Sequence, residues 1–248
     1  MTTFLIGIDD TDNESSPGTG RLARRLCDEC IRQNLRLLGV TRHQFLVDPA
    51  IPYTSHNSGA CIGIESGNGP EDWDFAYNFV ARNCAEGSDP GVCVAAASDV
   101  PDFVIEFGNL ATREVVTMSE AFRLAKDASI SLRGLGGTSG GVIGALGSVG
   151  LRASGNNGRF IDLPGLRELQ GCVNAAAFDR IGVMVEHGSW DREPKASDRY
   201  ETLNWVRPRL IGGKAVLPVE WNQQKNVWIP LDKKNATMIE IPEVRMKN

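Results

Sequence analysis

The chain has 248 residues, 42% hydrophobic and 23% charged, an ordinary composition for a folded protein of one large or two modest domains. No apolar run reaches the ~20 residues of a membrane span, and the N-terminus lacks the basic region of a signal peptide, so we expect a cytoplasmic protein without membrane contact. The net charge of −5 divides into −7 for residues 1–100 and +2 for the remainder. Since neither part has a strong positive excess, we expect weak or no nucleic-acid binding by the chain alone.

The first hundred residues predict a strand–helix–strand–strand–helix–strand order. Short runs rich in strand formers indicate the strands, and apolar residues at helical spacing indicate the helices. The predicted strands are 4–9, 35–49, 60–65 and 91–97, and the predicted helices are 20–34 and 71–85. This order is typical of a ferredoxin-like or related α/β sandwich.

The residues after 100 predict a second set of elements. Two helices are expected at 101–111 and 118–128, then a Gly-rich turn running into a helix at 131–151, a strand at 158–163, and strands within 205–221 and 226–232. The polar stretch 189–199 is expected to be a loop. The predicted fold class is therefore α/β (α+β), with a ferredoxin-like βαββαβ N-terminal half followed by a second α/β domain.

The six cysteines do not form a metal-binding pattern. Cys27 and Cys30 are the one closely spaced pair, and both fall within the predicted helix 20–34. No second pair and no nearby histidine completes a tetrahedral zinc site. We expect free thiols in or near the core.

Three aspartates, Asp9, Asp10 and Asp12, directly follow the first predicted strand. Ligand sites of α/β folds lie beyond the carboxyl ends of strands, and clustered carboxylates repel each other unless a cation neutralises them. Mg²⁺ binds one or two carboxylates together with phosphate oxygens. A turn whose side chains cap backbone amides explains the same residues, and the spacing leaves both interpretations open.

Gly18, Thr19 and Gly20 precede the predicted helix 20–34. Backbone amides at a helix N-terminus bind phosphate readily. Amides for a phosphate beside carboxylates for a metal predict a metal–nucleotide site. The alternative role of Thr19 is that of a helix N-cap.

A second candidate for phosphate binding is the Gly-rich turn after residue 130. Its candidate residues are Gly136, Gly137, Thr138, Ser139, Gly140 and Gly141. It is not a Walker A motif, because Val142 stands in the place of the lysine, and Ser139 breaks the GxGxxG pattern. Glycine then recurs every third residue from Gly141 to Gly150, although each costs a helix up to ~1 kcal/mol relative to alanine. Close packing of the helix and amides presented to phosphate both explain this pattern.

Three segments together resemble a known family, the archaeal agmatinylcytidine synthetases that modify an isoleucine tRNA. GIDDTDNESSPGTGRLA (7–23) is similar to the family's G-I-D-D-T-D-S motif and the threonine that follows it. DPAIPYTSHNSGACIGI (48–64) and GGVIGALGSVGL (140–151) resemble its N-x-x-I-P and R-G-x-I-G-A segments. The chain departs from the family at Asp48, Ser58 and Gly140, the last of which stands in the place of an arginine.

The resemblance implies a kinase-like domain that uses ATP and Mg²⁺ at residues 1–130, followed by a ferredoxin-like domain at residues 131–248. It implies metal binding by Asp9, Asp10 and Asp12, catalytic roles for Thr19 and Asp10, and phosphate uptake by Thr19 itself. The implied nucleotide-binding residues are Gly18, Gly20, Asn57 and the turn 136–141. We expect the chain to lack the family's OB-fold and zinc ribbon, which help to hold tRNA.

We therefore expect an ATP- and Mg²⁺-dependent phosphotransferase or ligase-like enzyme that acts on a small molecule or nucleoside. The acceptor and the oligomeric state are not predicted. The alternatives are a nucleotide-responsive binding or regulatory protein without turnover, and a tRNA-modifying subunit that needs a partner for RNA binding. His56 is either a residue of the site or, as the more common case, a surface-loop histidine.

Overall fold

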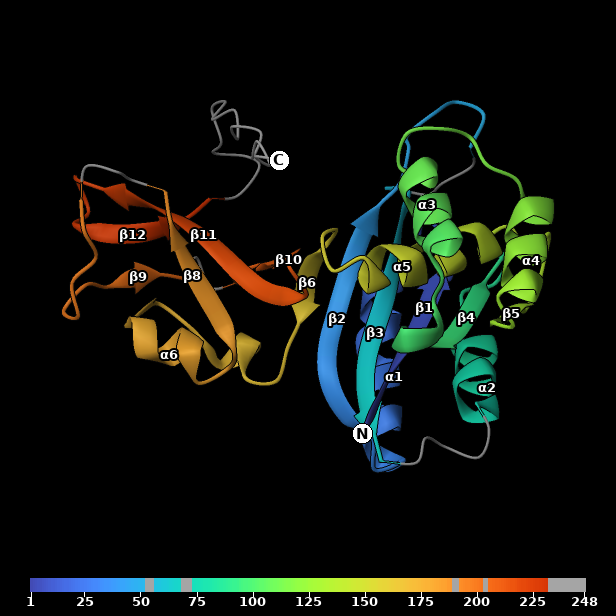
Figure 1. Cartoon of the computed structure of the whole chain (residues 1–248), viewed down its shortest axis with the longest axis horizontal. Coiled ribbons are helices and arrows are strands. Elements are labelled where there is room, and N and C mark those ends of the chain that lie inside the picture. Colours follow the sequence, from blue (N-terminus) through green and yellow to red (C-terminus); the bar gives the residue numbers. More distant parts are fainter. Residues whose placement is uncertain (52–55, 68–72, 189–191, 203–204, 232–248) are drawn as a thin grey trace, which may run out of the picture.

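The computed structural model describes residues 1–51, 56–67, 73–188, 192–202 and 205–231 (Figure 1). They form two lobes joined by one continuous sheet. Among these residues, no helix is both long and apolar enough to cross a bilayer.

The first lobe contains the predicted strand–helix–strand–strand–helix–strand order. These elements are β1 (Thr2–Asp9), α1 (Thr19–Arg32), β2 (Arg36–Gln44), β3 (Ser58–Ser66), α2 (Asp74–Asn83) and β4 (Gly91–Ala96). The lobe is completed by a short 3₁₀ turn (Ala97–Asp99), α3 (Asp102–Ala111), α4 (Met118–Asp127), β5 (Ser131–Gly134) and α5 (Val142–Ala153). Its strands lie in the order β5-β4-β1-β3-β2, and every neighbouring pair is antiparallel.

Helices cover both faces of this sheet. Because successive strand residues point to opposite faces, Ile6 and Ile62 pack against α1 and α2, whereas Leu5 and Cys61 pack against α3, α4 and α5. Both faces are therefore covered, which explains why β1, β3 and β4 at the centre of the sheet are largely apolar. The candidate site lies at one edge of this packing, at the end of β1 and the start of β4.

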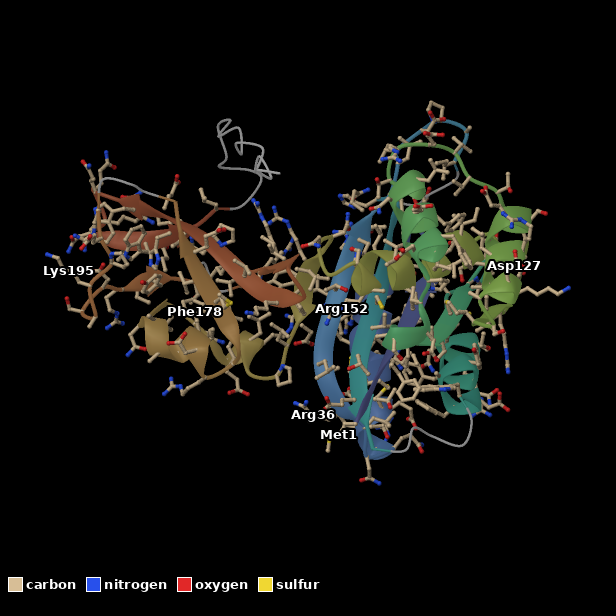
Figure 2. All side chains as sticks on the ribbon, in the orientation of Figure 1. Met1, Arg36, Asp127, Arg152, Phe178 and Lys195 are labelled. Atoms are coloured by element: carbon tan, nitrogen blue, oxygen red, sulfur yellow. The ribbon has the colours of Figure 1, made fainter. Side chains whose placement is uncertain are left out.

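The second lobe is mostly β-structure. Its elements are β6 (Arg159–Asp162), a 3₁₀ turn (Leu166–Glu168), β7 (Cys172–Val173), α6 (Ala175–Asp179), β8 (Val183–His187), β9 (Tyr200–Glu201), β10 (Arg209–Ile211), β11 (Lys214–Asn222) and β12 (Val227–Pro230). The sheet continues from β2 through β6-β10-β11-β12-β9-β7, and β8 pairs with β11. Its core contains Phe178, labelled in Figure 2, with Tyr200 and Trp228.

Arg152 lies at the junction of the two lobes (Figure 2). It stands at the end of α5, and its guanidinium carbon is 4.7 Å from the ring centre of Phe160 in β6. Burial lowers the pKa of this guanidinium. The stacking contact holds the end of the first lobe against the first strand of the second.

The α/β class is confirmed, whereas the expected domain division at residues 130/131 stays a prediction. β5 pairs with β4, and α5 packs in one core with residues of β1 and β4, so residues 131–153 belong to the first lobe. The change of lobe falls between α5 and β6. The described elements after Ala153 follow the order β6-β7-α6-β8-β9-β10-β11-β12, and the expected ferredoxin-like domain at 131–248 stays a prediction. The ferredoxin-like assignment of the N-terminal half stays a prediction.

The cysteines are free, as expected. Cys27, Cys30, Cys61 and Cys93 are buried, Cys84 is partly buried and Cys172 is exposed. Burial raises the pKa of the Cys30 thiol to about 12. The CxxC pair thus belongs to the core face of α1.

Close packing of α5 explains its recurring glycines. A side-chain carbon at Gly147 would lie 2.9 Å from the ring of Phe45, and one at Gly150 would lie 2.3 Å from the carbonyl oxygen of Val104 in α3. The predicted close approach to this backbone is therefore confirmed.

Replacing Gly150 by alanine is expected to lower the stability by about 1–3 kcal/mol, because a clash with backbone outweighs the ~1 kcal/mol that alanine gains in helix propensity. Gly67→Ala is the control, since no atom of the described residues lies within 4 Å of the added carbon there. Thermal unfolding of both variants measures the difference. An unchanged or raised melting temperature for Gly150→Ala would contradict the packing.

Candidate functional site

The acidic cluster begins at the end of β1, where Asp9 is packed under α5. A side-chain carbon at Gly144 would lie 1.7 Å from Asp9 Oδ2, so glycine is needed there to admit the carboxylate. Burial raises the pKa of Asp9 to about 7, with a hydrogen bond from the Asp10 backbone opposing the rise and the charges of Asp10 and Asp12 adding to it.

Asp10 turns the chain away from the strand through a left-handed conformation, with φ of 51°. Such conformations are costly for residues other than glycine, and aspartate tolerates them better than most. Burial raises the pKa of Asp10, and the charges of Asp89 and Asp12 raise it further. Asp10 thus faces two other carboxylates.

Asp89 is a member of the cluster that sequence reasoning missed. It lies just before β4, and β4 runs antiparallel to β1 with Gly91 opposite Asp9. The start of one strand is therefore beside the end of the other. The signal in the sequence was an Asp-Pro pair before a predicted strand, which becomes informative only when the pairing of β1 and β4 is known.

Asp89 also holds the Gly-rich turn in place. Its carboxylate accepts hydrogen bonds from the backbone N and the hydroxyl of Thr138 at 2.7 and 2.6 Å, and its backbone carbonyl accepts one from Gly141 N at 2.9 Å. Gly137 has φ of 51°, and a side chain there would collide with this carboxylate. The turn is thereby fixed beside the acidic cluster, and the amides of Thr138 and Gly141 have partners within the protein.

Thr19 is the first residue of α1 and forms a hydroxyl–carboxylate pair with Asp12. Its hydroxyl donates to Asp12 Oδ1 at 2.7 Å and accepts from the hydroxyl of Thr11 at 3.0 Å. The N-cap position is occupied by Gly18, and no side chain of that residue caps the helix. The N-cap interpretation of Thr19 is therefore wrong, whereas Asp12 does accept from the backbone N of Thr19 at 3.3 Å.

These groups border two adjacent cavities. The first is lined by carboxylates, by apolar residues and by the Gly-rich turn; its lining includes Asp9, Asp10, Asp12, Asp89, Glu114, Phe45, Ile51, Val116, Asn57, Thr138, Gly140, Gly141 and Gly144. The second contains Gly18, Thr19 and Gly20 at the start of α1. Asp12, His56 and Ser58 line both.

The predicted site residues are thus divided between two neighbouring cavities. Gly136, Gly137 and Ser139 are exceptions that line neither cavity, and their role in nucleotide binding stays a prediction. Asn57 lines it, but its amide nitrogen donates to the Leu46 carbonyl at 2.6 Å. His56 is exposed and borders both cavities, so its two interpretations are compatible.

The carboxylates would supply some of the ligands of a cation, and a substrate phosphate would supply the others. Among the described residues, no three His, Cys, Asp or Glu side chains converge closely enough to hold a metal ion alone. Mg²⁺ commonly takes only one or two carboxylates and obtains its other ligands from phosphate and water. Burial is the largest cause of the raised pKa values of Asp9 and Asp10, and the charges of the neighbouring carboxylates add to it. A cation would relieve this added repulsion.

Comparisons with known proteins point to one group of solved structures. No protein-family model and no curated protein matches the chain. The complex of TiaS with an isoleucine tRNA and ATP is 25% identical at a TM-score of 0.53, and a tRNA fluorescent labeling enzyme is 26% identical at 0.50. The complex of TiaS with the same tRNA, AMPCPP and agmatine is 24% identical at 0.51.

Each of these alignments covers 60% of this chain and 36% of the solved one, so the chain spans about a third of the length of these proteins. TiaS is described as an isoleucine-tRNA agmatidine synthetase. The resemblance predicted from the three sequence motifs is therefore confirmed as a partial match in fold.

Proposed function

We propose that the chain is an ATP- and Mg²⁺-dependent phosphotransferase or ligase-like enzyme, with Thr19 and Asp12 at its reacting centre. The observation that carries this proposal is the 2.7 Å hydrogen bond from the Thr19 hydroxyl to Asp12, beside a cluster of carboxylates. A hydroxyl held by a base is the general arrangement of an activated oxygen nucleophile. The TiaS complexes with ATP and AMPCPP support ATP as the nucleotide.

In this role the Thr19 oxygen attacks the terminal phosphorus of ATP while its proton passes to Asp12. The bond from that phosphorus to the ADP oxygen breaks, and the phosphoryl group is then available to an acceptor. Asp9 and Asp10 are the residues that would hold Mg²⁺, which when bound supplies charge neutralisation to the phosphates. Asp89 keeps the turn 136–141 against these carboxylates.

The acceptor class follows from the charge of the chain. The first hundred residues carry −7, which does not favour binding of a long RNA by this chain alone. We therefore propose a small molecule or a nucleoside. The second candidate is a tRNA-modifying subunit that binds RNA with a partner, and it is favoured by the tRNA in the TiaS complexes. The third candidate function is that of a nucleotide-responsive binding or regulatory protein without turnover.

We expect ATP to bind measurably with Mg²⁺ and at least about tenfold more weakly with EDTA, because clustered carboxylates repel a bare polyphosphate. Calorimetry with and without Mg²⁺, followed by chromatography of the nucleotide products, measures binding and turnover separately. Asp10→Asn should weaken the Mg²⁺-dependent binding, and Asp102→Asn on the exposed start of α3 is the matched control.

Equal affinity in EDTA would exclude the metal. Binding without any product over a panel of nucleosides and small-molecule acceptors would favour the regulatory alternative over turnover.

A further inference from the structure

The second cavity, at the start of α1, contains a cluster of arginines from three separate parts of the chain. Arg21 and Arg24 come from α1, Arg42 from β2, and Arg207 from the segment before β10. Asp12 is the one carboxylate in its lining among the described residues. The cavity therefore has the opposite charge to its neighbour, although it shares three residues with it.

These four guanidinium groups outnumber the carboxylates around them, which are Asp12 near Arg42 and Asp162 near Arg24. None of the four forms an ion pair within the described part of the chain. Burial and the charge of Arg207 lower the pKa of Arg42, and Asp12 opposes this shift only in part. Burial and the charges of Arg167 and Arg21 likewise lower the pKa of Arg24 against the opposing charge of Asp162. Like charges kept in a partly buried space cost free energy unless an anion neutralises them.

Other side chains orient two of the arginines. Arg42 Nε donates to the Ser58 hydroxyl at 2.9 Å, and the guanidinium carbon of Arg207 lies 3.9 Å from the ring centre of Trp205. A cation held over an indole ring keeps its charge and its outward N–H groups available. Ser58 and Trp205 are thus positioning residues for an arginine pair that faces the cavity.

We propose that this arginine cavity binds phosphate groups of a nucleotide and delivers one of them to Thr19 and Asp12. Planar guanidinium groups match phosphate oxygens in pairs. Gly18, Thr19 and Gly20 at the start of α1 line the same cavity, although the Thr19 amide already donates to Asp12. Because Thr19 belongs to this cavity and Asp12 to both, a phosphate here is adjacent to the hydroxyl–carboxylate pair. The phosphate belongs to ATP or to a phosphorylated acceptor, and the reaction it serves rests on the proposed function.

Binding of inorganic tripolyphosphate to the full chain, measured by calorimetry in EDTA, tests the cavity without turnover or metal. Arg42→Gln and Arg207→Gln should each weaken binding about tenfold or more, since each removes charge-assisted hydrogen bonds. Arg123→Gln is the matched control: Arg123 is exposed on α4, on the other face of the sheet, and loses the same charge. Trp205→Leu should weaken binding less than Arg207→Gln.

The proposal would be overturned if Arg42→Gln, Arg207→Gln and the control Arg123→Gln lost tripolyphosphate affinity equally, or if the wild-type chain did not bind tripolyphosphate. Competition identifies the source of the phosphate. In a second buffer that contains Mg²⁺ and no EDTA, displacement of tripolyphosphate by Mg²⁺-ATP assigns the cavity to the triphosphate, whereas displacement by a nucleoside monophosphate while ATP stays bound assigns it to the acceptor. Tripolyphosphate binding that depends on Arg42 and Arg207 in a chain that consumes no ATP would support the cavity and contradict the proposed function.

Discussion

Thr19→Ala is expected to abolish ATP consumption while leaving Mg²⁺-ATP binding within a few-fold of the wild type. The hydroxyl that alanine removes is the one that donates to Asp12 at 2.7 Å, so the variant has no oxygen to accept a phosphoryl group. Thr19→Ser keeps the oxygen and should restore part of the turnover. Asp12→Asn should lower kcat by about 10²–10⁴-fold, the usual contribution of a general base.

A structural effect of Thr19→Ala is expected to be small and separable. Thr19 is not the N-cap of α1, so alanine loses only its hydrogen bonds to Asp12 and Thr11, or about 1 kcal/mol. Turnover is therefore measured well below the melting transition of each variant. Full ATP consumption by the alanine variant would remove Thr19 from the reaction, and loss of binding together with turnover would indicate a structural role instead.

The elements with strong local patterns could be predicted from the sequence. The run FLIGID indicated β1 because a strand buried on both faces is continuously apolar, and the apolar stripe from Leu22 to Cys30 indicated α1. The two-residue strands β7 and β9 are too short to leave a pattern, and they exist through their pairing with each other. β5 was taken as part of a turn because only its pairing with β4 makes it a strand.

The same distinction holds for the candidate site: residues that are close in the sequence could be predicted, and residues that only the fold brings together could not. Asp9, Asp10, Asp12 and Thr19 are within a few residues of each other, so their spacing was visible in the sequence. Asp89 lies beside them because β4 pairs antiparallel with β1, and this pairing is not visible in the local sequence. The arginines of the second cavity are separated by up to about 190 residues and meet through the fold alone, which is why no local motif indicated a basic site in an acidic chain.

Asp9→Asn is expected to stabilise the folded chain at alkaline pH while weakening Mg²⁺-ATP binding. The folded-state pKa of Asp9, about 7, is above the ordinary value of 3.8, so the folded state holds the proton more tightly than the unfolded state. The stability that Asp9 contributes is therefore complete below about pH 4 and is lost as the pH rises through 7. Asparagine is neutral at every pH and does not incur this loss. At pH 8 the variant should be more stable by an amount on the order of 2–4 kcal/mol, and the difference should disappear toward pH 4.

Denaturant unfolding of Asp9→Asn and wild type from pH 4 to pH 8 measures this difference. The control is Glu106→Gln, which changes an exposed carboxylate on α3 and whose stability relative to wild type should change little with pH. A variant less stable than wild type at pH 8 would mean that the carboxylate serves as a structural anchor under α5. A stabilised variant that has lost Mg²⁺-dependent nucleotide binding is the expected result. It would show that the chain keeps a buried carboxylate at a cost in stability because binding requires its charge, as is common where residues serve function rather than folding.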